Sequence, residues 1–116
     1  MSYDIKTVPN YERRVRRLLK HYASLKSDLL DLMEQLSENP MMGVDLGNGF
    51  RKVRMRIRSK GKGKSGGARV ITHTANVIVS ENSGVLYLID IYDKSVQESV
   101  EISKIRRLLM ESKESG

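Results

Sequence analysis

The spacing of apolar residues changes along the chain and predicts the order of its elements. After Asn10, apolar residues recur every three or four positions, and the same rhythm returns after Ser24 and ends at Asn39 and Pro40. Both stretches predict amphipathic helices, and Asn10 and Ser24 are residue types that cap helix N-termini. The short break between them favours a helical hairpin. The apolar stripes consist of Tyr11, Val15, Leu18, Leu19 and Tyr22, and of Leu25, Leu29, Leu32, Met33 and Leu36.

Elsewhere the apolar period is two, which is typical of strands with one buried face. Residues 3–6 alternate and predict a short strand before Pro9. After a turn-rich loop from Gly43 to Gly49, apolar residues alternate with basic ones over residues 52–58. Residues 68–80 are rich in β-branched side chains, and residues 85–92 form a nearly continuous apolar run suited to a central strand. The connections between these three later strands are too short for a crossover helix, so we expect antiparallel pairing.

A last amphipathic segment from about Val100 predicts a C-terminal helix with Ile102, Ile105 and Leu109 on its apolar face and Leu108 beside them. The order of strand, two helices, three strands and helix indicates the α+β class. A length of 116 residues fits a single domain over residues 1–116.

Composition narrows the classes of protein that fit. The chain is 39% hydrophobic and 30% charged, which is globular, and it has no cysteine, which excludes disulfides, thiolate zinc sites and cysteine nucleophiles. No apolar run approaches the roughly 20 residues that span a bilayer, and the N-terminus lacks the pattern of a secretion signal. We therefore expect a soluble cytoplasmic protein.

The net charge of +7 is concentrated in one part of the chain. No acidic residue occurs between Leu46 and Ser80, whereas the rest of the chain has a small acidic excess. Such a one-signed stretch is typical of a surface that binds a polyanion such as nucleic acid, although a merely solvated face is the alternative. The nine cations of this stretch are Arg51, Lys52, Arg54, Arg56, Arg58, Lys60, Lys62, Lys64 and Arg69.

Glycines at positions 61, 63 and 66 match a dinucleotide-binding spacing, but a β-branched strand follows where that motif needs a helix. A phosphate-binding P-loop is excluded for the same reason. We interpret residues 59–67 as a mobile basic hairpin loop in which Lys60, Lys62 and Lys64 follow an RNA backbone. A plain flexible hairpin is the alternative.

The two histidines give no sign of a metal site. His21 lies on the first predicted helix and is expected at its surface, and His73 shares strand parity with Arg69 and Ile71. His73 therefore either faces the basic site or packs in the sheet. No cluster of His, Asp and Glu has metal-ligand spacing, so we expect neither a metal nor a cofactor.

The remaining candidate site is a set of cations on neighbouring strands. Lys52 and Arg54 share one strand face, Arg69 begins the next strand, and Tyr92 and Lys94 share parity at the end of the following one. In an antiparallel sheet these positions can converge. Cleavage of RNA by its own 2′-hydroxyl needs a base, stabilisation of the charge at phosphorus and a proton for the leaving oxygen. Crowded lysines and arginines can supply all three, and a binding groove without turnover is the alternative.

Three segments give the chain a resemblance to the RelE and HigB toxins of bacterial type II toxin–antitoxin modules, within the RelE/ParE superfamily. They are residues 9–40, residues 47–72 (GNGFRKVRMRIRSKGKGKSGGARVIT) and residues 85–95 (VLYLIDIYDKS). The resemblance implies a small twisted antiparallel sheet with an N-terminal helical hairpin packed on it and a C-terminal helix. It also implies a cytoplasmic, ribosome-dependent and metal-independent mRNA endonuclease that inhibits translation and is silenced by a cognate antitoxin.

Matched position by position, the resemblance assigns catalysis to Lys52, Arg54, Arg69 and Lys94. Contacts to RNA are expected from Arg56, Arg58, Lys60, Lys62, Lys64, His73 and Tyr92. Thr72 departs from the family, since many relatives have Tyr there, and no C-terminal Tyr matches one that some members use. The alternative function on the same fold is a nonenzymatic, ParE-like DNA gyrase inhibitor or a nucleic-acid-binding protein.

The antitoxin is expected to cover the sheet face that carries Lys52, Arg54 and Arg69, or to displace the C-terminal helix that borders this face. In the first case it presents acidic residues to Lys52, Arg54 and Arg69. In the second it replaces the helix around Ile105 and Leu109 with an amphipathic helix of its own.

Overall fold

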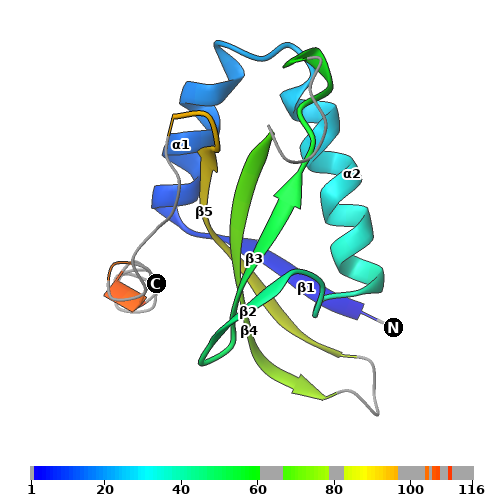
Figure 1. Cartoon of the computed structure of the whole chain (residues 1–116). Helices are drawn as coiled ribbons and strands as arrows, with labels where there is room; N and C mark the ends of the chain where they lie inside the picture. Colours follow the sequence, from blue (N-terminus) through cyan, green and yellow to red (C-terminus); the bar gives the residue numbers. More distant parts are fainter. Residues whose placement is uncertain are drawn as a thin grey trace.

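The structure, a computed structural model, describes residues 2–60, 67–78 and 83–96, together with Lys104, Arg106, Arg107 and Met110. The described chain forms one five-stranded sheet and two helices (Figure 1). The elements are β1 (Ser2–Thr7), α1 (Pro9–Leu19), α2 (Leu25–Glu38), β2 (Val44–Gly47), β3 (Phe50–Met55), a short 3-10 helix η1 (Arg58–Lys60), β4 (Ala68–Ile78) and β5 (Ser83–Asp93).

The sheet has the order β1-β5-β4-β3-β2 and is mixed. The antiparallel pairing predicted for β3, β4 and β5 is confirmed. The expectation of a wholly antiparallel sheet is wrong, because β1 runs parallel to β5 with Ser2 opposite Ser83 and Thr7 opposite Leu88. The rule of short connections does not constrain β1, since two helices follow it before the chain returns to the sheet.

Residues 44–47 form a strand, β2, where the sequence pattern predicted only a loop. β2 pairs with β3 through a two-residue turn in which Asn48 has φ 56° and Gly49 has φ 87°. Positive φ at both positions is what a tight hairpin turn requires, and the Asn-Gly dipeptide supplies it at low steric cost. This dipeptide was the signal that could have predicted the hairpin.

Both predicted helices are present, but the predicted cap at Asn10 is wrong. α2 begins directly after Ser24, as expected, although the Ser24 hydroxyl makes no capping bond to the helix backbone, whereas α1 begins at Pro9 with Val8 at its N-cap. Asn10 lies inside α1, and its amide donates to the backbone oxygen of Ile89 at 3.1 Å and to the Asp90 carboxylate at 3.0 Å. Asn10 therefore ties the helix to β5 instead of capping it.

Both helices lie on one side of the sheet, α1 against β5 and α2 against β1 (Figure 1). The helix-facing side of β3 carries the buried Val53 and Met55, while Arg54 between them is exposed, which confirms the alternation predicted for this strand. One predicted core member is wrong, since Leu19 at the end of α1 is exposed. The core also contains Leu25, Leu29, Leu32, Leu36, Val70, Leu86, Leu88 and Ile91.

The predicted C-terminal helix falls mostly outside the described residues, including Ile102, Ile105, Leu108 and Leu109. Lys104, Arg106, Arg107 and Met110 have helical conformation. In the ranges that the structure describes, neither helix is long and apolar enough to cross a membrane.

Candidate functional site

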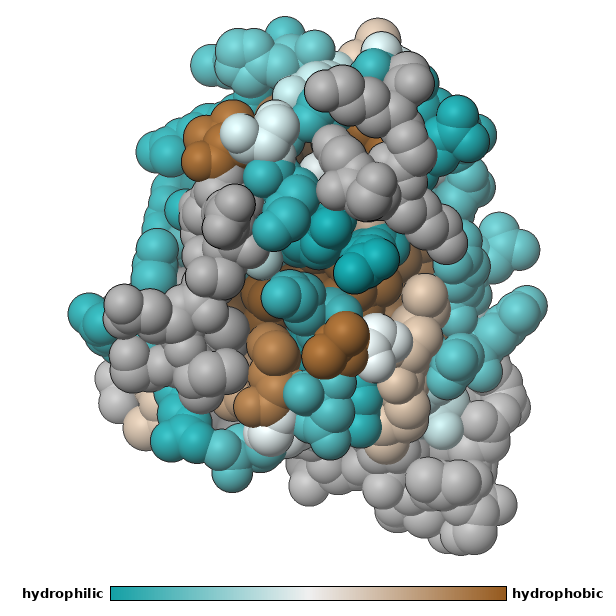
Figure 2. All heavy atoms as spheres, viewed as in Figure 1, coloured by the Kyte–Doolittle hydropathy of each residue, from teal (hydrophilic) through white to brown (hydrophobic). Residues whose placement is uncertain are grey.

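Three predicted site residues lie in one row across the sheet, on the side away from the helices. Arg54 on β3 is directly opposite Arg69 on β4, and Arg69 is directly opposite Tyr92 on β5. Directly opposed residues of antiparallel strands point to the same face with Cβ atoms about 5 Å apart. We call Arg54, Arg69 and Tyr92 the cationic row. Figure 2 shows this side of the molecule, where hydrophilic residues lie over the middle of the sheet beside hydrophobic ones.

The neighbouring row on the same face consists of Lys52, Ile71 and Asp90. Asp90 is fully buried, and its Oδ1 receives hydrogen bonds from Asn10 and from its neighbour's amide, Ile91 N, and an ion pair from Arg14 at 3.4 Å. Because α1 contributes two of these partners, donors of this helix compensate the negative charge of Asp90. Lys52 is half-buried and lies on the same sheet face as Arg54, in the neighbouring row.

The cationic row brings two like charges together. Burial lowers the pKa of Arg69, whose side chain is only 4% exposed, and the charge of Arg54 lowers it further. Burial also raises the pKa of Tyr92, against the opposing effect of Arg69. Like charges directly opposite each other destabilise a sheet. A phosphate between the two guanidinium groups would relieve this repulsion, so the row is suited to bind an anion.

Glycine at position 67 allows β4 to begin close to β3. A Cβ atom on Gly67 would lie 2.2 Å from the backbone oxygen of Met55, so no larger residue fits without moving a strand. The backbone oxygen of Gly67 accepts a hydrogen bond from Lys94 N at 3.0 Å. Lys94 is half-buried in the turn after β5, one position beyond the strand, so the predicted fourth catalytic cation lies beside the start of β4.

Arg58, predicted to contact RNA, lies in η1 and is used in ion pairs with α2. Its Nε donates to Asp28 Oδ1 at 2.8 Å, its guanidinium also pairs with Asp31, and its backbone amide donates to Asp28 at 3.2 Å. Asp28 is buried, so these bonds fix η1 against the helix. The two carboxylates offset the charge that Arg58 would offer to a phosphate.

Lys60, predicted to lie on a mobile loop, is held in the body of the protein. Its Nζ is 2.6 Å from Asp93 Oδ1 and 3.1 Å from Ser95 Oγ, and it lies over the ring of Tyr22. The hydroxyl of Tyr22 donates to the other Asp93 oxygen. We call Tyr22, Lys60, Asp93 and Ser95 the Asp93 cluster. Sequence reasoning missed this cluster, because its members come from three separate segments with no common spacing.

The remaining predicted RNA contacts differ in position. Arg56 is exposed just beyond the end of β3. His73 lies on the cationic face of β4, but its ring packs on Phe50 with centroids 4.5 Å apart, and its Nε2 is 3.2 Å from the backbone oxygen of Asn48. This contact favours the packing role that the sequence had left open. Lys62 and Lys64 lie outside the described residues.

Within residues 2–60, 67–78 and 83–96, no three His, Asp or Glu side chains gather closely enough to hold a metal ion. On the sheet face away from the helices, the described residues offer guanidinium, ammonium, phenol and imidazole groups, together with the buried carboxylate of Asp90.

Comparison with known proteins gives a structural likeness only. No family model and no curated protein matches the sequence. The structure is similar to that of the E. coli toxin RelE in the free state, in a variant with two arginines replaced by alanine. The TM-score is 0.58 at 15% sequence identity, over 96% of this chain and 97% of the RelE chain. This likeness extends over nearly the whole of both chains and shows a RelE-like fold.

Proposed function

We propose that this protein is a toxin of the RelE type that cleaves mRNA on the ribosome and belongs to a toxin–antitoxin module. The observation that supports this function best is the cationic row on the open face of a RelE-like fold. Arg54 and Arg69 come from different strands and face one another, which suits two guanidinium groups to hold one phosphodiester.

The proposed reaction is an attack of the RNA's own 2′-hydroxyl oxygen on the adjacent phosphorus. The new bond joins O2′ to phosphorus, and the bond from phosphorus to O5′ breaks, which leaves a 2′,3′-cyclic phosphate and a 5′-hydroxyl end. Negative charge grows on the two non-bridging oxygens in the transition state. In this proposal Arg54 and Arg69 stabilise that charge. Stabilisation of transition-state charge by fixed donors is usually the largest single contribution to catalysis.

Two proton transfers complete the reaction. Lys52 shares the cationic face with Arg54, and we assign it to accept the proton of the 2′-hydroxyl. Lys94 lies in the turn directly after β5, where its backbone amide bonds to the start of β4, and we assign it to give a proton to the leaving O5′. In this scheme the chain's own side chains perform both transfers.

The test is induced expression in a bacterial host, followed by mapping of mRNA 5′ ends. Cleavage at fixed positions within codons supports the proposal, and it should disappear in the Arg54→Ala/Arg69→Ala variant. The matched control is Arg13→Ala/Arg16→Ala, which removes two exposed arginines of α1 and should still cleave. Growth arrest with intact messages and a DNA-damage response would instead indicate a gyrase inhibitor on the same fold.

A further inference from the structure

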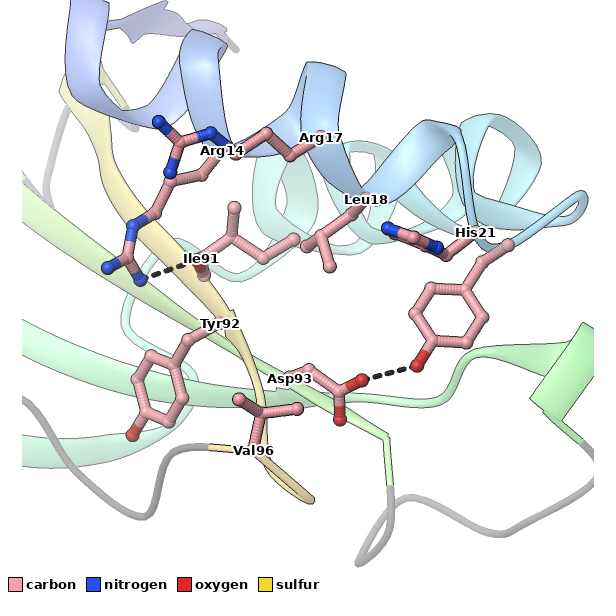
Figure 3. Close-up of a pocket in the computed structure, with 9 residues that line it drawn as sticks. Arg14, Arg17, Leu18, His21, Ile91, Tyr92, Asp93 and Val96 are labelled. Atoms are coloured by element: carbon pink, nitrogen blue, oxygen red, sulfur yellow. Dashed lines mark hydrogen bonds between the residues drawn. The ribbon is translucent and has the colours of Figure 1, made fainter.

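A pocket of about 450 Å³ lies between α1 and the end of β5 (Figure 3). Leu18, Ile91 and Val96 lie along its middle, with Arg14 and Tyr92 at one end. Arg17 also lines it from α1. The pocket thus combines an apolar floor with guanidinium groups and the ring of Tyr92 at one end, and with the side chains of His21, Tyr22 and Asp93 at the other. The cleavage reaction proposed above does not use this pocket.

The pocket meets the end of the cationic row at the edge of β5, since Tyr92 points away from the helices and its neighbour Ile91 points toward them. Tyr92 belongs to both, because it is the third member of the row and also lines the pocket. Adjacent strands are about 4.8 Å apart, so the distance from Arg54 across Arg69 to Tyr92 is about 10 Å. A ligand whose phosphate lies between Arg54 and Arg69 therefore reaches the pocket by extending past Tyr92 and around the edge of β5, where no strand pairs beyond Leu88.

The backbone of β5 and the side chains of α1 hold this end of the pocket in place. Arg14 donates from Nη1 to the backbone oxygen of Ile91 at 3.3 Å and pairs with the buried Asp90. A dashed line in Figure 3 marks the bond to Ile91. Because Asp90 and Ile91 are both buried in β5, the guanidinium is fixed beside the apolar floor before any ligand arrives.

A nucleobase has the chemistry that this pocket offers. Its flat faces are apolar enough to pack on aliphatic side chains and on an aromatic ring, and its edge carries hydrogen-bond acceptors that guanidinium groups recognise. Its attached phosphate is drawn to the same cationic surface. An acidic peptide could supply the charge, but it lacks a planar ring with polar edges.

We propose that the pocket between α1 and β5 binds the nucleobase of the nucleotide next to the phosphate held by the cationic row. This inference rests on the proposed function and adds a base subsite to it. Leu18 and Val96 contact the face of the base, with the buried Ile91 behind them, and Arg14 and Arg17 contact its edge.

The test uses NMR of methyl-labelled protein titrated with guanosine or adenosine 5′-monophosphate. The methyl resonances of Leu18, Ile91 and Val96 should shift with either nucleotide, because a bound base brings its ring current to them. Ribose 5-phosphate and inorganic phosphate carry the same charged group without a base and should leave these resonances in place. Equal shifts with ribose 5-phosphate would overturn the base subsite.

A substitution at Val96 offers a second test, because it can block the pocket without disturbing the core. Val96 is 83% exposed, so Val96→Trp should fold and cover the floor, and it should weaken nucleotide binding about tenfold or more. Val44→Trp is the matched control, since Val44 is an exposed valine of β2, at the far edge of the sheet from β5, and nucleotide binding should be unchanged. Undiminished binding by Val96→Trp would contradict the proposal.

The two proposals can fail separately. Cleavage of mRNA by a protein whose pocket methyls ignore nucleotides would refute the base subsite and leave the proposed function in place. Nucleotide-dependent shifts in a protein that leaves mRNA intact would support the subsite and refute the endonuclease.

Discussion

Arg69 carries a charge in a place where burial and a like charge both disfavour the charged form. Its guanidinium is buried and faces the like charge of Arg54, and both effects lower the pKa of Arg69, although the residue lies on the sheet face that the helices do not cover. A residue that costs folding free energy in this way is typical of a binding or catalytic site, where its interaction with a ligand offsets the cost. Burial and the facing charge of Arg54 therefore distinguish Arg69 from the other lysines and arginines in the part of the chain that the structure describes.

Replacing Arg69 should remove activity while the fold remains. We expect Arg69→Ala to lower the rate of mRNA cleavage by roughly 100-fold, because one fixed donor to the transition state contributes on the order of 3 kcal/mol. Arg69→Lys should recover only part of the loss, since a point charge cannot form the two parallel bonds of a guanidinium. Cleavage in a defined in vitro translation reaction measures both.

The control for this prediction is Arg13→Ala, which removes an exposed arginine of α1. Circular dichroism should show the same folded content for all variants. A folded Arg69→Ala protein with full activity would remove Arg69 from the site.

The Asp93 cluster predicts a dependence of stability on pH. Burial alone would raise the pKa of Asp93, but hydrogen bonds from Lys60, Tyr22 and Ser95 outweigh it and hold the pKa well below its usual range. The pKa is thus lower in the folded state than in the unfolded state. The stabilisation is complete above about pH 4, the ordinary value for Asp, and is lost as the pH falls further.

We therefore expect Asp93→Asn to cost about 3 kcal/mol in free energy of unfolding at pH 7. At pH 3 the cost should be smaller, because the wild-type carboxylate then begins to lose its advantage over the unfolded state. Urea unfolding at both pH values measures the difference. Asp4→Asn, an exposed change on β1, should have little effect at either pH, and an equal cost of Asp93→Asn at both would contradict the assignment.

Among the contacts between elements, the packing of α1 against β5 holds the end of β5 in place. β1 pairs with β5 only as far as Leu88, so the edge of β5 beyond that point has no strand beside it. Asn10 and Arg14 of α1 donate to the backbone oxygens of Ile89 and Ile91 along that edge. The helix thus replaces a missing strand, and it fixes the end of β5 that carries Tyr92.

Asn10→Ala should destabilise the protein by about 1–2 kcal/mol, because it leaves the buried Asp90 with one donor fewer and the Ile89 oxygen without its amide. Thermal unfolding followed by circular dichroism measures the effect. Gln35→Ala, an exposed change on α2, should stay within about 0.5 kcal/mol. A loss no larger for Asn10→Ala than for this control would mean that the two bonds contribute little.

For the whole molecule, the distribution of charge governs how RNA binds. Lys62→Ala/Lys64→Ala should weaken RNA binding and flatten its salt dependence, by about 0.7 in the log–log slope for each phosphate that these lysines no longer neutralise. Lys60 is left unchanged, because it holds Asp93. Binding of a single-stranded RNA at several salt concentrations measures the slope. Lys6→Ala/Lys26→Ala removes the same charge from exposed positions of β1 and α2, and an equal slope change there would assign the loop to solubility.

A protein with this proposed activity also needs a partner that restrains it. We expect the product of an adjacent small reading frame to bind this chain and to relieve growth arrest, with acidic residues set against Lys52, Arg54 and Arg69. Co-expression and co-purification measure both properties. The complex should weaken as salt increases, and a product that neither binds nor relieves arrest would argue against a toxin–antitoxin module.

Local patterns in the chain were enough to predict the α+β class, both helices of the described residues and the cationic face of β3. The reason is that hydrophobic period, helix length and strand parity are properties of neighbouring residues, and Lys52 and Arg54 lie on one face of any strand that contains them. The Asn-Gly turn of residues 48 and 49 belongs to the same class of signal and was overlooked.

Only the tertiary structure decided which distant residues meet. The register between strands placed Arg54, Arg69 and Tyr92 in one row, and a long connection let β1 pair parallel to β5. The tertiary structure also set Asp28 against Arg58 and Asp93 against Lys60, so two of the cations expected to contact RNA pair with carboxylates. Pairing of this kind depends on how separate segments pack, and no spacing within one segment records it.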